Sequence, residues 1–411
     1  MFEVQGSIGA VRGFRVAGIH GGLKKSGAPD LALIVADRLC VAAGVFTRNL
    51  AKAAPILVSQ EYLRTHAQTI RAVIVNTTCA NALTGKKGMD DARQVTRLVA
   101  DGLGLQAPQQ VLPMSTGVIG TLLPMDKIAS AIPQAISRLG QDWQAAAQAI
   151  MTTDTRPKMA SVCVETAEGS YTIAGISKGA GMIAPNMATM LGIIATDAKI
   201  SLPIAQRTLH TANEVSFNRI VVDGDTSTND CVFLLANGAS GVAIDKPSEL
   251  ALFERALTEV CVKLAQAIVR DGEGATKFIT LRVIHAQDAA SAAQIAHTIA
   301  ASPLVKTAFF GQDANWGRIV AAAGRAGQPF DPDRAQLWIA PGESLPNSGH
   351  GLLLFKHGTV AKYSEADAAA IFREPSISVT LDCGVGGRGS AVVWTCDLSR
   401  EYVDINADYR S

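Results

Sequence analysis

Six short segments rich in threonine, glycine and asparagine carry the residues that could do chemistry in this sequence. Main-chain amides and hydroxyl groups of this kind bind a carboxylate or a developing oxyanion. Any one such segment is explained by turns and caps, which favour the same residue types. Six together, in a chain without an obvious histidine or cysteine nucleophile, favour a functional site. They are NTTCANALTG (76–85), STGVIG (115–120), TTDTRPK (152–158), KGAGMIAPNMATM (178–190), DGDTSTND (223–230) and DGEGATK (271–277).

The dipeptide Ala188-Thr189 has the most specific chemical implication in these segments. A threonine hydroxyl is a weak nucleophile unless a base lies beside it, and its own α-amine can be that base once the preceding peptide bond is cut. A released α-amine titrates at about 8, so it can accept the hydroxyl proton near neutral pH. The chemistry implies self-cleavage, in which Thr189 Oγ attacks the Ala188 carbonyl. Thr116 and Gly117, in a tight glycine turn, could supply a hydroxyl and an N–H to the oxyanion.

Other motifs give weaker signals. The glycine-rich run at 384–389 does not have dinucleotide-binding spacing and precedes a predicted strand, so a turn is the better interpretation. The seven histidines are dispersed, with no pair at metal-ligand spacing, so we expect no metal site. There is no G-x-S-x-G elbow for a hydrolase triad. The seven cysteines include no C-x-x-C pair, which favours free, mostly buried thiols in a reducing compartment.

Composition limits the class of partner. The chain has 411 residues, a formal charge of +1 and only 5% aromatic residues. Nucleic-acid binding draws on a surplus of lysine and arginine and on stacking aromatics, so we expect no nucleic-acid partner. No apolar run is long enough for a membrane span or a signal peptide. We therefore expect a cytoplasmic protein with a small-molecule ligand.

The elements that must position these residues alternate irregularly between strands and helices. The runs 31–36 and 40–46, around Asp37 and Arg38, predict a hairpin. Apolar periodicity predicts further helices and strands, and the loop from Lys178 leads into a buried strand at about Thr189. This pattern predicts a layered α/β sandwich with largely antiparallel strands, and a smaller α/β subdomain after about residue 285. The predicted helices are 90–103, 249–269 and 289–300, and the predicted strands include 72–75, 171–176, 376–381 and 391–395.

At these residues the sequence resembles the ornithine acetyltransferase (glutamate N-acetyltransferase) family, the arginine biosynthesis bifunctional proteins. The resemblance covers nearly the whole chain, and long motifs occurring in order make it specific. The motifs are GFRVAGIHGGLKKSGAPDLALI, STGVIG, MTTDTRPK, KGAGMIAPNMATML, VDGDTSTND, RDGEGATK, SPLVKTAFFGQDANWGRI and the terminal YVDINADYRS.

The resemblance implies an enzyme that cleaves itself between Ala188 and Thr189. The products are an α chain, residues 1–188, and a β chain, residues 189–411, that carries the nucleophile and a smaller subdomain from about 285 to 395. It also implies a sandwich related to N-terminal-nucleophile hydrolases, assembled from two α and two β chains. Such an enzyme moves acetyl from N-acetyl-L-ornithine to L-glutamate through an acetyl-threonine, without a cofactor.

Site roles follow from the same resemblance. Thr189 is the expected nucleophile, and Thr116 and Gly117 form the expected oxyanion hole. Thr152 and Thr153 are alternatives to Thr155, because they lie in the same motif. The family often has glycine where this chain has Thr78, so the loop around Thr78 is expected to differ in detail. The expected substrate contacts are Thr155, Lys178, Thr189, Glu273, Asn406 and Ser411.

Two alternatives to this transferase stay open. The same self-cleaved scaffold could be an amidohydrolase or aminopeptidase with water as the acceptor. The motifs could also form the pocket of a non-catalytic protein that binds an amino acid. The sequence does not decide whether acetyl-CoA is a second acetyl donor.

Overall fold

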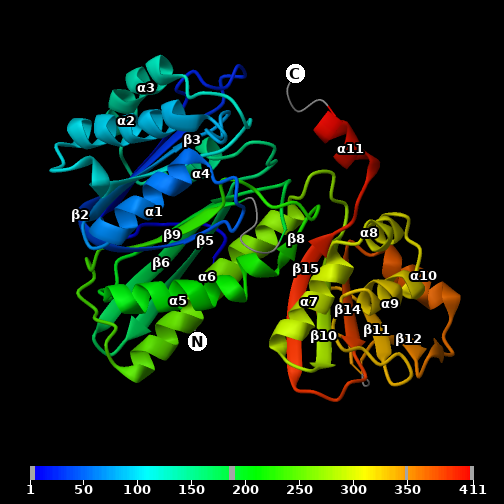
Figure 1. Ribbon diagram of the computed structural model, residues 1–411. Coiled ribbons are helices and arrows are strands. Elements are labelled where there is room, and N and C mark those ends of the chain that lie inside the picture. The colour runs from blue at the N-terminus through cyan, green and yellow to red at the C-terminus, as the bar shows by residue number, and fades with distance from the viewer. Residues whose placement is uncertain (1–4, 185–189, 348–349, 408–411) are drawn as a thin grey trace. The chain divides into compact units, whose positions relative to one another are not determined.

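The computed structural model describes residues 5–184, 190–347 and 350–407, which form two compact units (Figure 1). The first unit takes in Met1–Gly179, Asn186–Asn218 and Thr226–Ile268. The second takes in Ala180–Pro185, Arg219–Asp225 and Val269–Ser411. Two of the six segments named above, 178–190 and 223–230, are therefore each divided between the units.

Among the described residues, the first unit holds an eight-stranded sheet in the order β4-β3-β2-β9-β7-β6-β5, with β1 on β2. Five of its strand pairs are antiparallel, and only β3 with β4 and β7 with β9 are parallel. The strands are β1 (Phe14–Ile19), β2 (Leu31–Phe46), β3 (Ile70–Asn76), β4 (Val111–Ser115), β5 (Lys158–Thr166), β6 (Gly169–Lys178), β7 (Leu191–Thr196) and β9 (Cys231–Ala236).

The predicted hairpin over residues 31–46 is wrong, because these residues form the single strand β2. Its first half pairs with β1 and β3, and its second half, Val41–Phe46, pairs with β9. The exposed residues Asp37, Arg38 and Leu39 stay extended between the halves. The polar residues thus mark a change of strand partners and not a turn.

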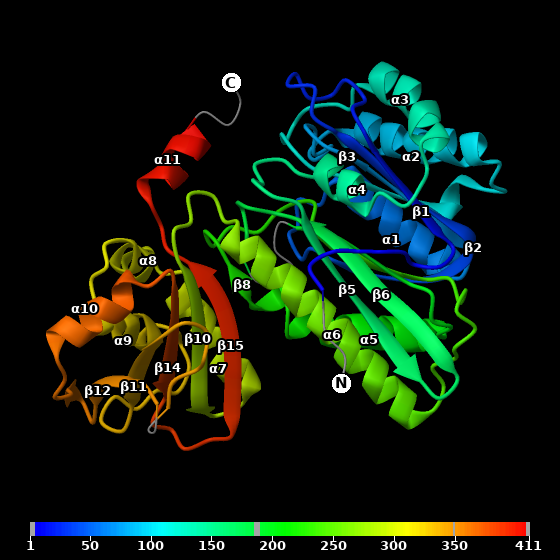
Figure 2. The same ribbon diagram turned by 180° about the vertical axis from the view of Figure 1, so that it is seen from behind.

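Alternate side chains of β2 face two different cores. Ala32, Ile34 and Ala36 belong to an inner core that also takes in residues of β6, β7 and β9. Leu31, Leu33 and Val35 pack with α2 (Gly85–Leu103) and α3 (Met125–Ser137). On the outer side of the other strands, Tyr171 of β6 lies beside Phe253 of α6 (Pro247–Arg270), with ring centroids 5.9 Å apart. Helices α1 (Ala54–His66) and α4 (Trp143–Ala149) contribute residues to the inner core as well, so helices and strands alternate in layers (Figure 2). The predicted layered α/β sandwich with largely antiparallel strands is confirmed.

The helices of the first unit follow the sequence pattern closely. The predicted helix at 90–103 begins earlier and ends at Gly104, whose positive φ of 66° suits a helix C-terminus. The predicted helix at 249–269 is confirmed as α6. The helices are α1 (Ala54–His66), α2 (Gly85–Leu103), α3 (Met125–Ser137), α4 (Trp143–Ala149), α5 (Leu202–Glu214) and α6 (Pro247–Arg270), which ends in the second unit.

The second unit has a seven-stranded sheet, counted over its described residues, in the order β13-β12-β11-β14-β10-β15-β8. Helices α7 to α10 pack on it through one apolar core. The predicted helix 289–300 and the strands at 376–381 and 391–395 are confirmed as α7, β14 and β15. The elements are β8 (Ile220–Val221), β10 (Phe278–Ala286), α7 (Ala289–Ala300), α8 (Pro303–Phe310), α9 (Trp316–Gly324), β11 (Gln336–Pro341), β12 (Leu352–Lys356), β13 (Thr359–Val360), α10 (Glu365–Arg373), β14 (Ser376–Asp382), β15 (Gly389–Cys396) and α11 (Arg400–Ala407).

Across the described residues, no helix combines the length and apolar character that a bilayer crossing requires.

Close packing of α4 on β1 depends on Gly18. A Cβ atom at this position lies 2.0 Å from the carbonyl oxygen of Ala145. We expect Gly18→Ala to lower the free energy of unfolding by about 1–3 kcal/mol, since the helix must move away from the strand. Urea unfolding measures the difference. Gly9→Ala is the control, because nothing lies within 4 Å of its Cβ position, and equal stability of both variants would contradict the close contact.

Candidate active site

Thr116 and Gly117 directly follow β4 and lie against the loop after β3. The Thr116 N–H donates to Asn76 O at 3.0 Å. Gly117 has φ +130°, and a Cβ there lies 2.2 Å from the Thr78 carbonyl carbon. Only glycine fits this approach of two backbones.

The Thr116 hydroxyl and the Gly117 N–H are the two donors that the predicted oxyanion hole requires. Within the described residues, neither group has a hydrogen-bond partner. Thr116 is only 6% exposed, so its hydroxyl is screened from bulk water.

Two buried asparagines fix the loop that carries these donors. Asn229 donates through Nδ2 to Ala80 O at 2.7 Å and to Ser115 O at 2.8 Å. Asn76 donates to Cys79 O at 3.0 Å and accepts the Ser115 hydroxyl at 2.6 Å. The segments 76–85, 115–120 and 223–230 thus meet in one hydrogen-bond network, which the sequence did not predict.

Thr78 adopts φ +71°, a left-handed conformation that is unusual for a β-branched residue. Its carbonyl accepts the Val118 N–H at 3.1 Å, which holds the loop in place. The loop therefore keeps a conformation that suits glycine although threonine occupies it.

Lys178, at the end of β6, is 3% exposed and lies in a buried charge cluster. Asp154 binds Lys158 Nζ at 2.6 Å and also accepts the Gly179 N–H at 2.6 Å. Burial opposes the ionisation of Asp154, but the charges of Lys178 and Lys158 outweigh it and hold its pKa well below the usual range. Asp154 thus fixes the backbone next to Lys178 as a carboxylate, with two lysine charges around it.

Thr155, the predicted substrate contact of this segment, is exposed. The Thr152 N–H donates to Asp154 Oδ2 at 2.9 Å. The segment TTDTRPK is therefore anchored through Asp154, and which of its threonines contacts substrate stays a prediction.

Asp230 directly precedes β9 and is fully buried. Its Oδ1 accepts the N–H of Met190 at 3.0 Å. Burial raises the pKa of Asp230 well above its ordinary value, although Met190, Ser227 and the charge of Lys178 act in the opposite direction. An acidic group is thus fixed to the peptide group that directly follows Thr189.

In the second unit, Glu273 and Asn406 lie together. Asn406 Nδ2 donates to Glu273 Oε2 at 2.7 Å, and the Glu273 N–H donates to Ala180 O at 2.9 Å. A Cβ on Gly181 lies 2.2 Å from a Glu273 carboxylate oxygen, so the carboxylate rests directly on this glycine. The structure brings these two predicted residues together.

Asp223 holds two residues of the segment 178–190 that follow Gly181. It accepts the N–H groups of Met182 at 2.5 Å and Ile183 at 2.8 Å, and the Tyr402 hydroxyl at 3.2 Å. Burial raises the pKa of Asp223, and these hydrogen bonds oppose the shift. The backbone from Ala180 to Ile183 is thus held by the Asp223 carboxylate and by the N–H of Glu273.

Ala188, Thr189 and Ser411 lie outside the described residues, so their predicted roles stay predictions. Sequence reasoning missed Asp154, Asp223 and Asp230, although each lies inside a segment that it singled out. The signal was an aspartate among turn residues, which is also typical of ordinary loops. In the described part of the chain, no three histidine, cysteine, aspartate or glutamate side chains gather as a metal site would require.

Replacing Thr78 with glycine tests the strain in the loop. We expect Thr78→Gly to raise the free energy of unfolding by about 1 kcal/mol, because the left-handed conformation costs threonine more than the added chain entropy costs glycine. Urea midpoints measure this. Thr77→Gly is the control. It should lower the free energy of unfolding, because the Thr77 hydroxyl donates to Asp30 O. An equal loss of stability in Thr78→Gly would contradict the strain.

Replacing Asp154 with asparagine tests the charge cluster. We expect Asp154→Asn to lower the free energy of unfolding by about 3–5 kcal/mol at pH 7, because two buried lysines then lie together without this carboxylate. The folded-state pKa of Asp154 is depressed, so its stabilisation is present above the unfolded value of about 4 and is lost as the pH falls below it. Urea unfolding is therefore measured at pH 7 and again at a pH below the unfolded pKa. The difference in the free energy of unfolding between wild type and variant should be smaller at the lower pH. Glu168→Gln, at an exposed pair with Lys246, should change little, and equal effects of the two substitutions would contradict this account.

Comparisons with known proteins agree with the motifs. A model of the ArgJ family matches residues 15–411. The chain is 46% identical to the arginine biosynthesis bifunctional protein ArgJ of Geobacter sulfurreducens, over 98% of this chain and 100% of that protein. It is 45% identical to the mitochondrial protein of the same name from Arthroderma otae, over 97% and 88%. A solved structure, ornithine acetyltransferase from Mycobacterium tuberculosis complexed with ornithine, is 38% identical and covers 45% of this chain and 98% of that chain, with a TM-score of 0.41.

The resemblance inferred from the motifs is thereby confirmed, and the chain belongs to the ArgJ family.

Proposed function

We propose that the chain is an acetyltransferase that moves acetyl from N-acetyl-L-ornithine to L-glutamate, a step of arginine biosynthesis. The observation that carries this is the match to the ArgJ family over residues 15–411. Relatives of this family are named arginine biosynthesis bifunctional proteins, and one solved relative is named ornithine acetyltransferase. The enzyme class and the pathway follow from that membership.

The proposed nucleophile is Thr189, freed by cleavage after Ala188. Its Oγ attacks the acetyl carbonyl and gives its proton to the new α-amine. The bond between the acetyl carbon and the ornithine nitrogen then breaks, and ornithine leaves with that proton. The amine of glutamate next attacks the acetyl ester and restores the hydroxyl. The acetyl group stays on the chain between the two half-reactions, so the reaction requires no cofactor.

The oxyanion of each step is proposed to lie against the Thr116 hydroxyl and the Gly117 N–H. The supporting observation is the fixed loop in which both donors lack partners among the described residues, while the Thr116 N–H is taken by Asn76. Preorganised donors of this kind cost no reorganisation when charge develops.

Substrate carboxylates are proposed to bind Lys178, whose charge lies in the buried cluster around Asp154. Glu273 can take the positive charge of an amino group, and Asn406 holds that carboxylate by a hydrogen bond. Thr155 and Ser411 complete the proposed contacts, by match of motif.

A second activity, acetylation of glutamate from acetyl-CoA, is favoured by the word bifunctional in the names of the relatives. Assays with each donor separately decide it. An amidohydrolase on the same scaffold is the alternative. Release of acetate that glutamate does not divert into N-acetylglutamate would favour that hydrolase.

We further propose two α and two β chains as the assembly and the cytoplasm as the location. The family resemblance supports the first. Six buried free cysteines among the described residues fit a reducing compartment. The fungal relatives are named mitochondrial, whereas the name of the Geobacter protein gives no compartment.

Thr189→Ala tests the nucleophile. We expect one uncut chain and loss of transfer by more than about 1,000-fold, because both the cleavage and the acetyl ester need the hydroxyl. Thr189→Ser keeps a hydroxyl and should still be cleaved. Intact mass and initial rates against both substrates give the readout, and parallel double-reciprocal lines are expected for wild type. Normal cleavage of Thr189→Ala would place the scissile bond elsewhere.

A further inference from the structure

Asp397 directly follows β15, is only 2% exposed and binds the loop that carries Glu273. Its Oδ1 accepts the N–H of Thr276 at 2.8 Å and that of Lys277 at 2.9 Å. Its Oδ2 accepts the Thr276 hydroxyl at 2.5 Å. Hydrogen bonds to a carboxylate are stronger than those between neutral groups. One buried side chain therefore fixes this loop a few residues after Glu273.

Lys306 of α8 holds the main chain of Asp397 on both sides. This buried lysine donates through Nζ to the carbonyl oxygen of Cys396, which precedes Asp397, and to the Thr395 hydroxyl at 3.0 Å. Its own carbonyl oxygen accepts the N–H of Leu398, which follows Asp397, at 3.3 Å. Lys306 belongs to the motif SPLVKTAFFGQDANWGRI, to which the transfer reaction gives no role. The backbone that presents the Asp397 carboxylate to the loop is thus itself fixed.

The same loop lies against the start of α11, the helix that follows β15 (Figure 1). Gly274 has φ +67°, and a Cβ there lies 2.7 Å from the Tyr402 nitrogen. Asn406 of α11 donates through Nδ2 to Glu273 Oε2 at 2.7 Å and to Tyr402 O at 2.9 Å. The Glu273 carboxylate therefore lies between two anchors, Asp397 before the helix and Asn406 within it.

We propose that Asp397 is a positioning residue of the transfer reaction, acting through Glu273. It holds the loop so that the Glu273 carboxylate receives the charged amino group of the substrate. The inference rests on the proposed function, in which Glu273 binds that group. N-acetylornithine keeps a charged amino group on its side chain throughout the reaction. Displacing its partner by about 1 Å is enough to weaken the contact strongly.

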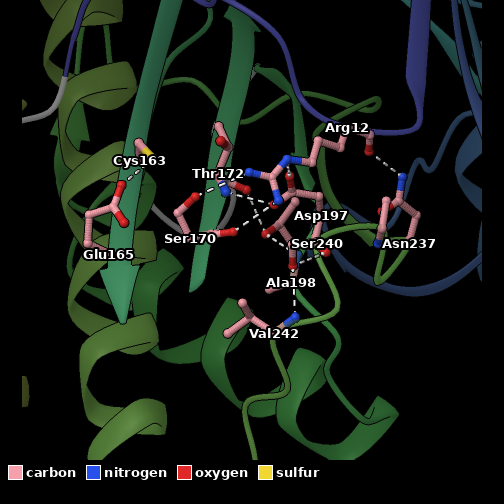
Figure 3. Close-up of polar contacts among 12 residues, drawn as sticks. Arg12, Cys163, Glu165, Ser170, Thr172, Asp197, Ala198, Asn237, Ser240 and Val242 are labelled. Carbon is pink, nitrogen blue, oxygen red and sulfur yellow. Dashed lines mark hydrogen bonds and ion pairs between the residues drawn. The ribbon is translucent and has the colours of Figure 1, made fainter. Parts of the chain in front are cut away.

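Two other carboxylates that hold backbone N–H groups provide matched controls. Asp382 ends β14 at the opposite end of the same sheet, where its Oδ1 accepts a loop N–H at 2.9 Å. Asp197 of the first unit is fully buried and accepts the Thr172 N–H at 2.7 Å (Figure 3). In the described structure, neither carboxylate forms a hydrogen bond with the loop 271–277.

The experiment measures initial rates of acetyl transfer by cleaved protein over a range of N-acetylornithine concentrations, at saturating glutamate. We expect Asp397→Asn to raise the KM for N-acetylornithine by about 10–100-fold and to change kcat by less than about threefold, because a contact made throughout the reaction is weakened. Asp382→Asn and Asp197→Asn should keep the wild-type KM. A purely structural role would lower the amount of active protein, and therefore kcat, at an unchanged KM. That result, or an equal rise of KM in either control, would overturn the inference.

Combination with Glu273→Gln tests whether Asp397 acts through Glu273. Glu273→Gln alone should raise the KM at least as much, and adding Asp397→Asn should change it further by less than about twofold, because residues that act through one contact are not additive. Effects that multiply would contradict the inference. Wild-type constants for Glu273→Gln would contradict the proposed substrate contact itself. An impaired Glu273→Gln beside an unaffected Asp397→Asn would contradict only the role of Asp397.

Near-UV circular dichroism checks the fold of each variant. If Asp397→Asn does not fold, Thr276→Val decides, because it removes the hydroxyl bond to Asp397 Oδ2 and leaves both N–H bonds in place. A raised KM in this variant supports the role of Asp397. A folded Thr276→Val protein with the wild-type KM contradicts it.

Discussion

Hydrogen bonds from backbone N–H groups to buried carboxylates fix the chain on both sides of the predicted cleavage site. Asp154 holds Gly179, Asp223 holds Met182 and Ile183, and Asp230 holds Met190. A nucleophile that uses its own α-amine works only if the neighbouring backbone stays in place after the peptide bond is cut. These bonds supply that constraint, and the remaining features of the site depend on it.

In the loops that carry the proposed oxyanion donors, neutral groups fix the backbone in place of carboxylates. Gly117 allows its backbone to pack on the carbonyl carbon of Thr78, and Asn229 joins the loops after β3 and β4. Rigid donors are effective because their orientation is fixed before the reaction starts. The lysine charges around Asp154 add a positive field in a site of low dielectric, which suits substrates that carry carboxylates.

The sequence predicted the class of fold and most long elements, because apolar periodicity in segments such as 249–269 depends only on local pattern. It failed at β2, where Asp37 and Arg38 suggested a turn, since the exchange of β1 for β9 as partner is a long-range property. It singled out the segments that hold Asp154, Asp223 and Asp230 but not these residues, because an aspartate in a polar loop looks the same whether it is exposed or buried. Burial and partners come only from the folded chain, whereas the roles of Thr189 and Ser411 still rest on motifs.

The central claim is that Thr189 carries the acetyl group after chain scission exposes its amine. The most direct measurement is mass spectrometry of the purified enzyme after incubation with N-acetylornithine in the absence of glutamate, followed by peptide mapping. We expect a fragment that starts at Thr189, bears one acetyl group on its hydroxyl, and loses this group when glutamate is added. An active enzyme that remains a single unacetylated chain of 411 residues would contradict it.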